Sequence, residues 1–205
     1  MDKVERTKQL LANTLRSMSR EMPLKKISVQ KLVERCQLNR GTFYYHFRDI
    51  SDLINWIYHT EITLPIYHYL RSYTEGELDS SEQVLRLLYA NKDFFMQAIQ
   101  MKGQNNLRDY ILTETQTNWV CLRDRILELR GTDYASLDET IREEMDHLLK
   151  YFCYGHYFTT LQWIQDGMPL PPERLAVILD TSASKGIFSA LSELLSGRAL
   201  FGGAV

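Results

Sequence analysis

Apolar residues recur three and four positions apart along most of the chain, which is the spacing of helices that bury one face. No stretch alternates apolar and polar residues for long enough to form a strand, and no longer segment repeats. The pattern therefore predicts an all-α fold of about nine helices. They are expected at residues 2–20, 28–36, 39–47, 51–71, 81–91, from 93, 106–130, 137–166 and 172–197.

Residues 28–48 read as two short helices joined by a tight turn, the arrangement of a helix-turn-helix. Ser28 is placed to cap the first helix and Asn39 to cap the second. The apolar stripe of the first helix comprises Val29, Leu32, Val33 and Cys36.

Further along the chain, Ser136 followed by Glu139 is typical of a capping box at the start of the helix near residue 137.

The second helix of the motif has a buried side and an aromatic outward side. Phe43 and Phe47, four residues apart, supply the buried face. The side chains left pointing outward are Thr42, Tyr44, Tyr45 and His46. In a major groove they would contact phosphates and base edges. The alternative for either tyrosine is that it packs on the following helix.

Charge is distributed unevenly between the two parts of the chain. The net charge is −2, but residues 1–50 hold 11 basic and 5 acidic residues, whereas residues 51–205 hold 13 basic and 21 acidic ones. A basic head on an acidic body is typical of a protein that presents one end to a polyanion.

Residues 27–54 resemble the DNA-binding domain of the TetR family of bacterial transcriptional regulators. The resemblance is carried by Gly-Thr-Phe-Tyr-Tyr-His-Phe at 41–47 and by Asp-Leu-Ile at 52–54. Two positions depart from the family pattern. Gln37 stands in the turn where glycine is usual. Ile50 replaces a lysine that commonly contacts a phosphate in this family, so Arg48 is the residue expected to substitute for that contact.

A second resemblance covers residues 151–172. This segment, with Gly155 and Trp163-Ile164-x-x-Gly167-Met168, is similar to the C-terminal domain of a TetR branch that includes regulators of dihydroxyacetone kinase operons. Together the resemblances imply a three-helix DNA-binding domain at residues 1–50. They also imply a larger helical domain at residues 51–205 that binds an effector and forms the dimer.

The function implied is that of a sequence-specific regulator that binds double-stranded DNA as a homodimer on a pseudo-palindromic operator. The expected mode is a repressor released by a small-molecule effector or a protein partner. The alternative is an activator whose helical domain binds a protein co-regulator. The residues expected to contact DNA are Ser28, Gln30, Asn39, Arg40, Gly41, Thr42, Tyr44, Tyr45, His46 and Arg48.

The body of the chain contains more aromatic and imidazole side chains than a polar helix surface requires. Buried tyrosine hydroxyls and imidazoles need hydrogen-bond partners, which favours a partly polar internal pocket. The alternative for each residue is plain core packing. The pocket is expected to include His59, Tyr67, Trp119, Tyr151 and His156. Pro65 is expected to bend the helix at 51–71, where the pocket would couple to the head.

The dimer is expected to be a four-helix bundle built from helices 137–166 and 172–196 of each subunit. On the last helix, small residues would allow close approach and larger apolar ones would fill the seam. The expected interface comprises Leu179, Ala183, Gly186, Ile187, Ala190, Leu191 and Leu194. The alternative is that this stripe packs only within its own subunit.

Other chemistry finds little support in the sequence. The three cysteines are odd in number and widely spaced, which does not indicate a disulfide framework. Glu144-x-x-His147 and Cys153-x-x-His156 each lack the second pair that a metal site needs. No nucleophile elbow, phosphate loop or dinucleotide fingerprint occurs. The expectation is a cytoplasmic protein without membrane span, metal, cofactor or enzymatic activity.

Overall fold

The computed structural model describes residues 2–74 and 81–196, with the side chains of Ile187 and Phe188 excepted, and that part of the chain is helical without strands. The helices are α1 (Lys3–Glu21), α2 (Val29–Arg35), α3 (Arg40–His46), α4 (Ile50–Tyr58), α5 (Leu64–Arg71), α6 (Ser81–Ala90), α7 (Lys92–Ala98), α8 (Leu107–Leu129), α9 (Glu139–Gln165), α10 (Pro172–Ser182) and α11 (Phe188–Leu195). A π-helical turn, His59–Thr63, joins α4 to α5, and another, Ala183–Ile187, joins α10 to α11. The described residues therefore form nine continuous helices, as predicted.

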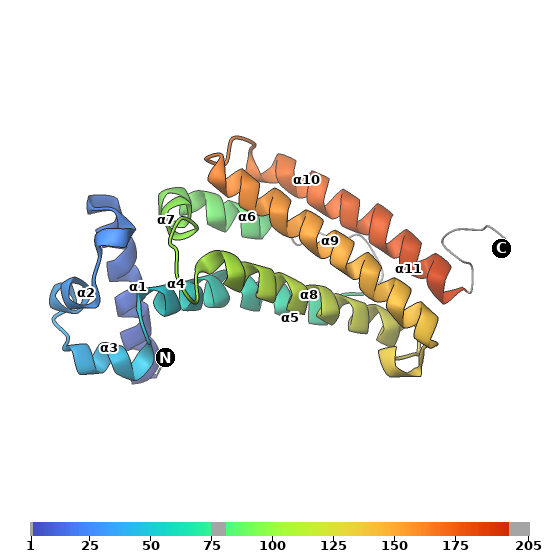
Figure 1. Cartoon of the computed structure of the whole chain (residues 1–205), viewed down its shortest axis with the longest axis horizontal. Coiled ribbons are helices and arrows are strands. Elements are labelled where there is room, and N and C mark those ends of the chain that lie inside the picture. The colour runs from blue at the N-terminus through green and yellow to red at the C-terminus, as the bar shows by residue number, and fades with distance from the viewer. Residues whose placement is uncertain (1, 75–80, 197–205) are drawn as a thin grey trace.

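The molecule is elongated, with α1–α3 grouped at one end (Figure 1). Helices α4 and α5, with the π-helical turn between them, form one continuous rod. This rod runs along the length of the molecule and packs against α8. Helix α6 packs on α10, while α11 packs on α9. One continuous hydrophobic core extends from the head into the body, since the same cluster contains Leu11, Phe43, Ile57, Phe95 and Leu161. The head is thus packed onto the body rather than tethered to it.

The helix-turn-helix forms as its caps predict. Oγ of Ser28 accepts a hydrogen bond from the Lys31 amide, and Oδ1 of Asn39 accepts one from the Thr42 amide at 2.7 Å. Gln37 adopts a left-handed conformation with φ of 55°, and the amide of Leu38 donates to the Val33 carbonyl at 2.8 Å. The turn is therefore closed by a non-glycine residue at a modest conformational cost.

The interruption in the rod of α4 and α5 lies in the turn that precedes Pro65. Proline lacks an amide donor, and its ring would collide with the carbonyl four residues earlier in a regular helix. The chain widens into the π-helical turn His59–Thr63, in which the Leu64 amide donates to the His59 carbonyl. The predicted irregularity near Pro65 therefore takes the form of a π bulge.

The predicted capping box at Ser136 is wrong. Ser136 belongs to a short 3-10 turn, Tyr134–Ser136, that is capped by Asp133. Helix α9 begins at Glu139, where Asp138 accepts a hydrogen bond from the Thr140 amide at 2.9 Å. An aspartate directly before the helix can reach the first free amides, so it displaces the more distant serine as the cap.

The stripe predicted to form the dimer seam instead packs within its own subunit. Four of its members are buried in the single chain: Leu179, Ala183, Leu191 and Leu194. A Cβ atom on Gly186 would lie 2.5 Å from Cζ of Phe152 in α9, so this glycine allows α9 to approach. Ala190 is partly buried, and the side chain of Ile187 lies outside the described part of the chain. This correction leaves other faces of α9 and α10 for a partner.

Candidate nucleic-acid interface and internal cavity

Helix α3 presents an aromatic surface at the end of the molecule. Phe43 is fully buried and fixes the helix in the head, whereas Tyr45 is 78% exposed and Tyr44 is 50% exposed. His46 lies against the Tyr45 ring, with centroids 4.9 Å apart. Burial first, and Lys8 second, lower the pKa of His46, which favours its neutral form. The exposed edge of α3 therefore offers hydroxyl and imidazole groups to a partner.

The first turn of α3 is already organised. Asn39 holds both the amide and the hydroxyl of Thr42, and a Cβ on Gly41 would lie 3.1 Å from Oδ1 of Asn39. The Arg40 guanidinium lies 5.8 Å from the centre of the Tyr44 ring and donates to its hydroxyl at 3.4 Å. Arg40 and Tyr44 thus form one exposed unit, while Asn39 and Thr42 are occupied in capping.

The remaining residues predicted to contact DNA differ in availability. Ser28 is engaged as the cap of α2, and the side-chain amide of Gln30 donates a hydrogen bond to the Glu34 carboxylate. Arg48 is exposed, and its guanidinium forms no ion pair or hydrogen bond among the described residues. Arg48 is therefore an exposed basic side chain next to α3 whose guanidinium has no partner among the described residues.

A cavity of about 100 Å³ lies inside the body, between α5, α6, α8, α9 and α10. Of the five residues predicted to line a pocket, Trp119 and His156 do so. His59, Tyr67 and Tyr151 lie elsewhere, which corrects that prediction: His59 bonds to Tyr110, and Tyr151 is 74% exposed. These three side chains do not line the cavity, and residue type alone does not reveal which helix face a residue occupies.

Several polar cavity residues were missed by the sequence analysis. They are Thr63, Glu114, Thr115, Asn118 and Thr160. The available signal was helical spacing: Thr115, Asn118, Trp119 and Leu122 share one face of α8, while His156 and Thr160 share one face of α9. Polar residues on otherwise apolar helix faces mark the cavity better than aromatic content does.

His156 is uncharged at neutral pH. The residue is half-buried at the cavity wall, and its ring lies edge-on to Trp119 with centroids 6.0 Å apart. Burial lowers the pKa of His156 to about 4, because no carboxylate compensates for the lost hydration of the imidazolium. The cavity therefore presents a neutral imidazole to whatever occupies it.

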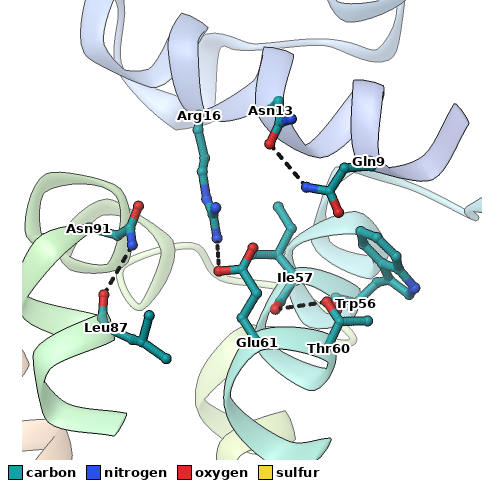
Figure 2. A network of polar contacts seen from close by, with 9 residues as sticks. All are labelled: Gln9, Asn13, Arg16, Trp56, Ile57, Thr60, Glu61, Leu87 and Asn91. Carbon is teal, nitrogen blue, oxygen red and sulfur yellow. Dashed lines mark hydrogen bonds and ion pairs between the residues drawn. The ribbon is translucent and has the colours of Figure 1, made fainter. Parts of the chain in front are cut away.

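The π-helical turn connects the cavity with the head. Arg16 of α1 donates to the carboxylate of Glu61 in this turn (Figure 2), and both side chains are largely buried. Thr63 of the same turn lines the cavity. The Arg16 guanidinium also lies 5.6 Å from the centre of the Phe94 ring. A change at the cavity wall thus has a short path to the first helix of the head.

Helix α7 holds the head at a second point. Oε1 of Gln97 accepts a hydrogen bond from the Leu24 amide at 2.8 Å, and its Nε2 donates to the Ser19 carbonyl at 3.1 Å. One side chain thereby satisfies two backbone groups at the end of α1 and after it. Together with the Arg16–Glu61 pair, this contact sets the orientation of the head on the body.

A family model described as a transcriptional regulator C-terminal region, of the TetR class, matches residues 78–185, more than half of the chain. The chain belongs to the TetR family of transcriptional regulators. A solved structure of similar fold is that of the dihydroxyacetone kinase operon activator DhaS. It aligns with a TM-score of 0.61 and 16% identity over 91% of this chain and 96% of that one. No curated protein matches the sequence significantly.

Two features are absent from the described residues of this TetR-family regulator. None of their helices is long and apolar enough to cross a membrane. No cluster of three or more histidine, cysteine, aspartate or glutamate side chains is arranged to hold a metal ion there.

The regulator also exposes apolar side chains on two body helices. Tyr151, Tyr154 and Phe158 lie on one face of α9, because they are separated by three and four residues. Val177 and Ile178 are exposed on α10. Apolar groups concentrated on long helices in this way are typical of a protein–protein contact.

Proposed function

We propose that this regulator binds double-stranded DNA sequence-specifically, with α3 in the major groove. The observation that carries the proposal is the exposure of Tyr45 on a helix anchored by the fully buried Phe43. Arg40 and Arg48 flank this surface, and the first fifty residues are strongly basic. In this proposal residues 1–50 form the DNA-binding domain, and residues 51–205 bind the effector and the second subunit.

The decisive experiment is selection of fragments from total genomic DNA by the purified full-length regulator, followed by sequencing. Recovery of a shared pseudo-palindromic sequence at a few loci supports the proposal. Uniform recovery of all fragments at physiological salt contradicts it, because nonspecific phosphate binding alone selects no sequence. Transcript levels of the adjoining genes with and without the regulator then distinguish a repressor from an activator.

Tyr45→Ala is expected to weaken operator binding by about 1 to 2 kcal/mol, roughly 5- to 30-fold, because a hydrogen bond to a phosphate or base is lost. Stability should be unchanged, since the side chain is 78% exposed. Fluorescence anisotropy with operator DNA measures the affinity. Tyr89→Ala, which removes an exposed tyrosine from α6, is the control and should bind as the wild type. Equal affinities for both variants would remove Tyr45 from the interface.

Arg48→Ala is expected to reduce the slope of log affinity against log salt concentration by about one unit, since one phosphate contact releases about one counterion. Binding titrations at several salt concentrations measure this slope. Arg35→Ala is the control, because the Arg35 guanidinium is held by Glu21. A wild-type slope for Arg48→Ala would show that this residue neutralises no phosphate.

We further propose that the regulator acts as a homodimer joined through the exposed apolar faces of α9 and α10. The support is the group of Tyr151, Tyr154 and Phe158, together with Val177 and Ile178, which a second copy would cover. To read two half-sites, the two-fold axis of such a bundle would have to set the two α3 helices about 34 to 36 Å apart, or a multiple of that distance.

Ligand response is the third element of the proposal. The cavity shares Thr63 with the π-helical turn that holds Arg16 through Glu61. A ligand that binds one conformation of this turn more tightly than another shifts the equilibrium toward the head orientation of that conformation. The affinity for DNA changes as a result. Release of a repressor is the favoured outcome. The second candidate is an activator assisted by a protein co-regulator, and its activator role is supported by the similar fold of DhaS, an operon activator.

A further inference from the structure

The cavity wall retains polar atoms that the fold itself does not satisfy. Oγ1 of Thr63, Oδ1 of Asn118 and Oγ1 of Thr160 are buried and have no hydrogen-bond partner among the described residues. Two other polar wall residues are occupied: Ser81 donates to Asp180, and Thr115 donates to the Ile111 carbonyl. An unpaired buried polar atom reduces stability. Three such atoms around one cavity are therefore better explained by a ligand than by packing.

Thr63 and Thr160 differ from five other helical threonines in how the hydroxyl is used. A threonine hydroxyl within a helix ordinarily donates to the carbonyl four residues earlier. In this structure the threonines that do so are Thr7, Thr60, Thr113, Thr115 and Thr117. Thr63 and Thr160, both at the cavity, form no such bond. Their hydroxyls remain available to donate to, or accept from, an occupant.

The free groups at the wall are all uncharged. No lysine or arginine lines the cavity within the described chain, so an anion would find no counter-charge. Glu114 is the carboxylate at the wall, and it already faces Nδ1 of His59 at 3.5 Å and interacts with the Tyr110 hydroxyl. His156 adds a neutral imidazole, and its ring nitrogens form no hydrogen bond with any described residue.

The remaining wall and the size of the cavity limit the ligand further. Most lining residues are apolar, including Ile66, Leu85, Leu88, Ile111 and Leu122. The volume of about 100 Å³ is somewhat smaller than a cavity of about 150 Å³ that accommodates benzene. The ligand thus has on the order of four to six non-hydrogen atoms, with a hydrocarbon part and at least one donor for the Asn118 carbonyl oxygen.

We propose that the cavity binds a compact, uncharged molecule whose hydroxyl groups pair with Thr63, Asn118 and Thr160 while its hydrocarbon part packs on the leucine and isoleucine wall. This inference names the chemical class of the effector, and it rests on the proposed ligand response only for the link to DNA binding.

The test titrates the full-length regulator with four probes of similar size, using calorimetry and thermal melting. Butanol and butanediol carry hydroxyl groups, whereas butyrate and butylammonium carry a charge. The neutral probes are expected to bind and raise the melting temperature. Saturable binding of a charged probe at equal or higher affinity overturns the proposal, as does the absence of binding by all four.

Isosteric variants localise the binding and separate it from structural effects. Thr160→Val and Thr63→Val should each weaken binding of the neutral probe by about 5- to 10-fold, the effect of one lost hydrogen bond. The unliganded variants should melt at the wild-type temperature or slightly above it, because a buried unpaired hydroxyl has been removed. Thr115→Val is the matched control and should retain affinity, since its hydroxyl is already bonded to Ile111.

DNA binding is measured in the same titrations so that two failures remain distinguishable. If a neutral probe binds at Thr160 but leaves operator affinity unchanged, the ligand class stands and the proposed regulation fails. If the regulator binds its operator but Thr160→Val and Thr115→Val bind the probe equally, the ligand class fails and the proposed DNA-binding function stands.

Discussion

Phe158→Arg is expected to convert the regulator from a dimer into monomers. Phe158 is exposed on α9 one helical turn after Tyr154, on the face proposed to meet its copy across a two-fold axis. An arginine there would bury an unpaired charge from each subunit, at a cost of about 3 to 5 kcal/mol or more. The dimer dissociation constant should rise at least about 100-fold, since each 1.4 kcal/mol corresponds to about a factor of ten.

Analytical ultracentrifugation at micromolar concentration measures this change, and operator titration measures its consequence. A monomer presents one α3 helix instead of two, so operator affinity should fall steeply while binding to a single half-site persists. Val120→Arg, which places the same charge at an exposed position of α8, is the control and should remain dimeric. A dimeric Phe158→Arg variant would place the interface elsewhere.

Gly186→Arg, by contrast, is no test of the dimer in this fold. Its Cβ alone would collide with the Phe152 ring of the same subunit, so the variant should lose stability before it loses its partner. Comparing the stability and the oligomeric state of the Gly186→Arg and Phe158→Arg variants distinguishes packing inside the subunit from packing between subunits.

His156→Leu is expected to make the regulator more resistant to acid. The folded state holds the pKa of His156 at about 4, against about 6.5 for an unperturbed histidine, so the unfolded chain binds the proton first as the pH falls. Wild-type stability should therefore decline between about pH 6.5 and pH 4 by about 2 to 3 kcal/mol from this group, with no contribution above that range.

Chemical denaturation at a series of pH values gives the free energies of unfolding. The difference between wild type and His156→Leu isolates the histidine from the carboxylates that titrate in the same range. Thr160→Val alters the same cavity without removing a titrating group, so its pH profile should parallel the wild type. A constant difference between wild type and His156→Leu across this range would show that His156 titrates normally.

The head of the regulator was predictable because its determinants are local. Ser28 and Asn39 cap helices that begin within one or two residues of them, and Phe43 and Phe47 are four residues apart on one face. Even the strained position of Gln37 follows from the short distance between two helices whose ends are fixed. Such features depend on contacts between residues that are close in the sequence, so they can be predicted without knowledge of the tertiary structure.

The number of helices was likewise set by the sequence, since glycines, prolines and capping residues interrupt the apolar pattern. Their exact starts were less certain where two caps compete, as Asp138 and Ser136 do before α9. The form of the irregularity at Pro65 also required the structure, because a kink and a π bulge both relieve the same clash with the proline ring.

Which helix faces meet was decided only by the tertiary structure. The stripe of Ala183, Gly186 and Leu191 is equally suited to a helix of its own subunit and to one of a partner, and the fold assigns it to its own α9. Tyr151 and Trp119 look equivalent as aromatic residues, yet one faces solvent and the other the cavity. Helical periodicity determines which residues share a face, but the neighbour of that face depends on the packing of segments far apart in the sequence.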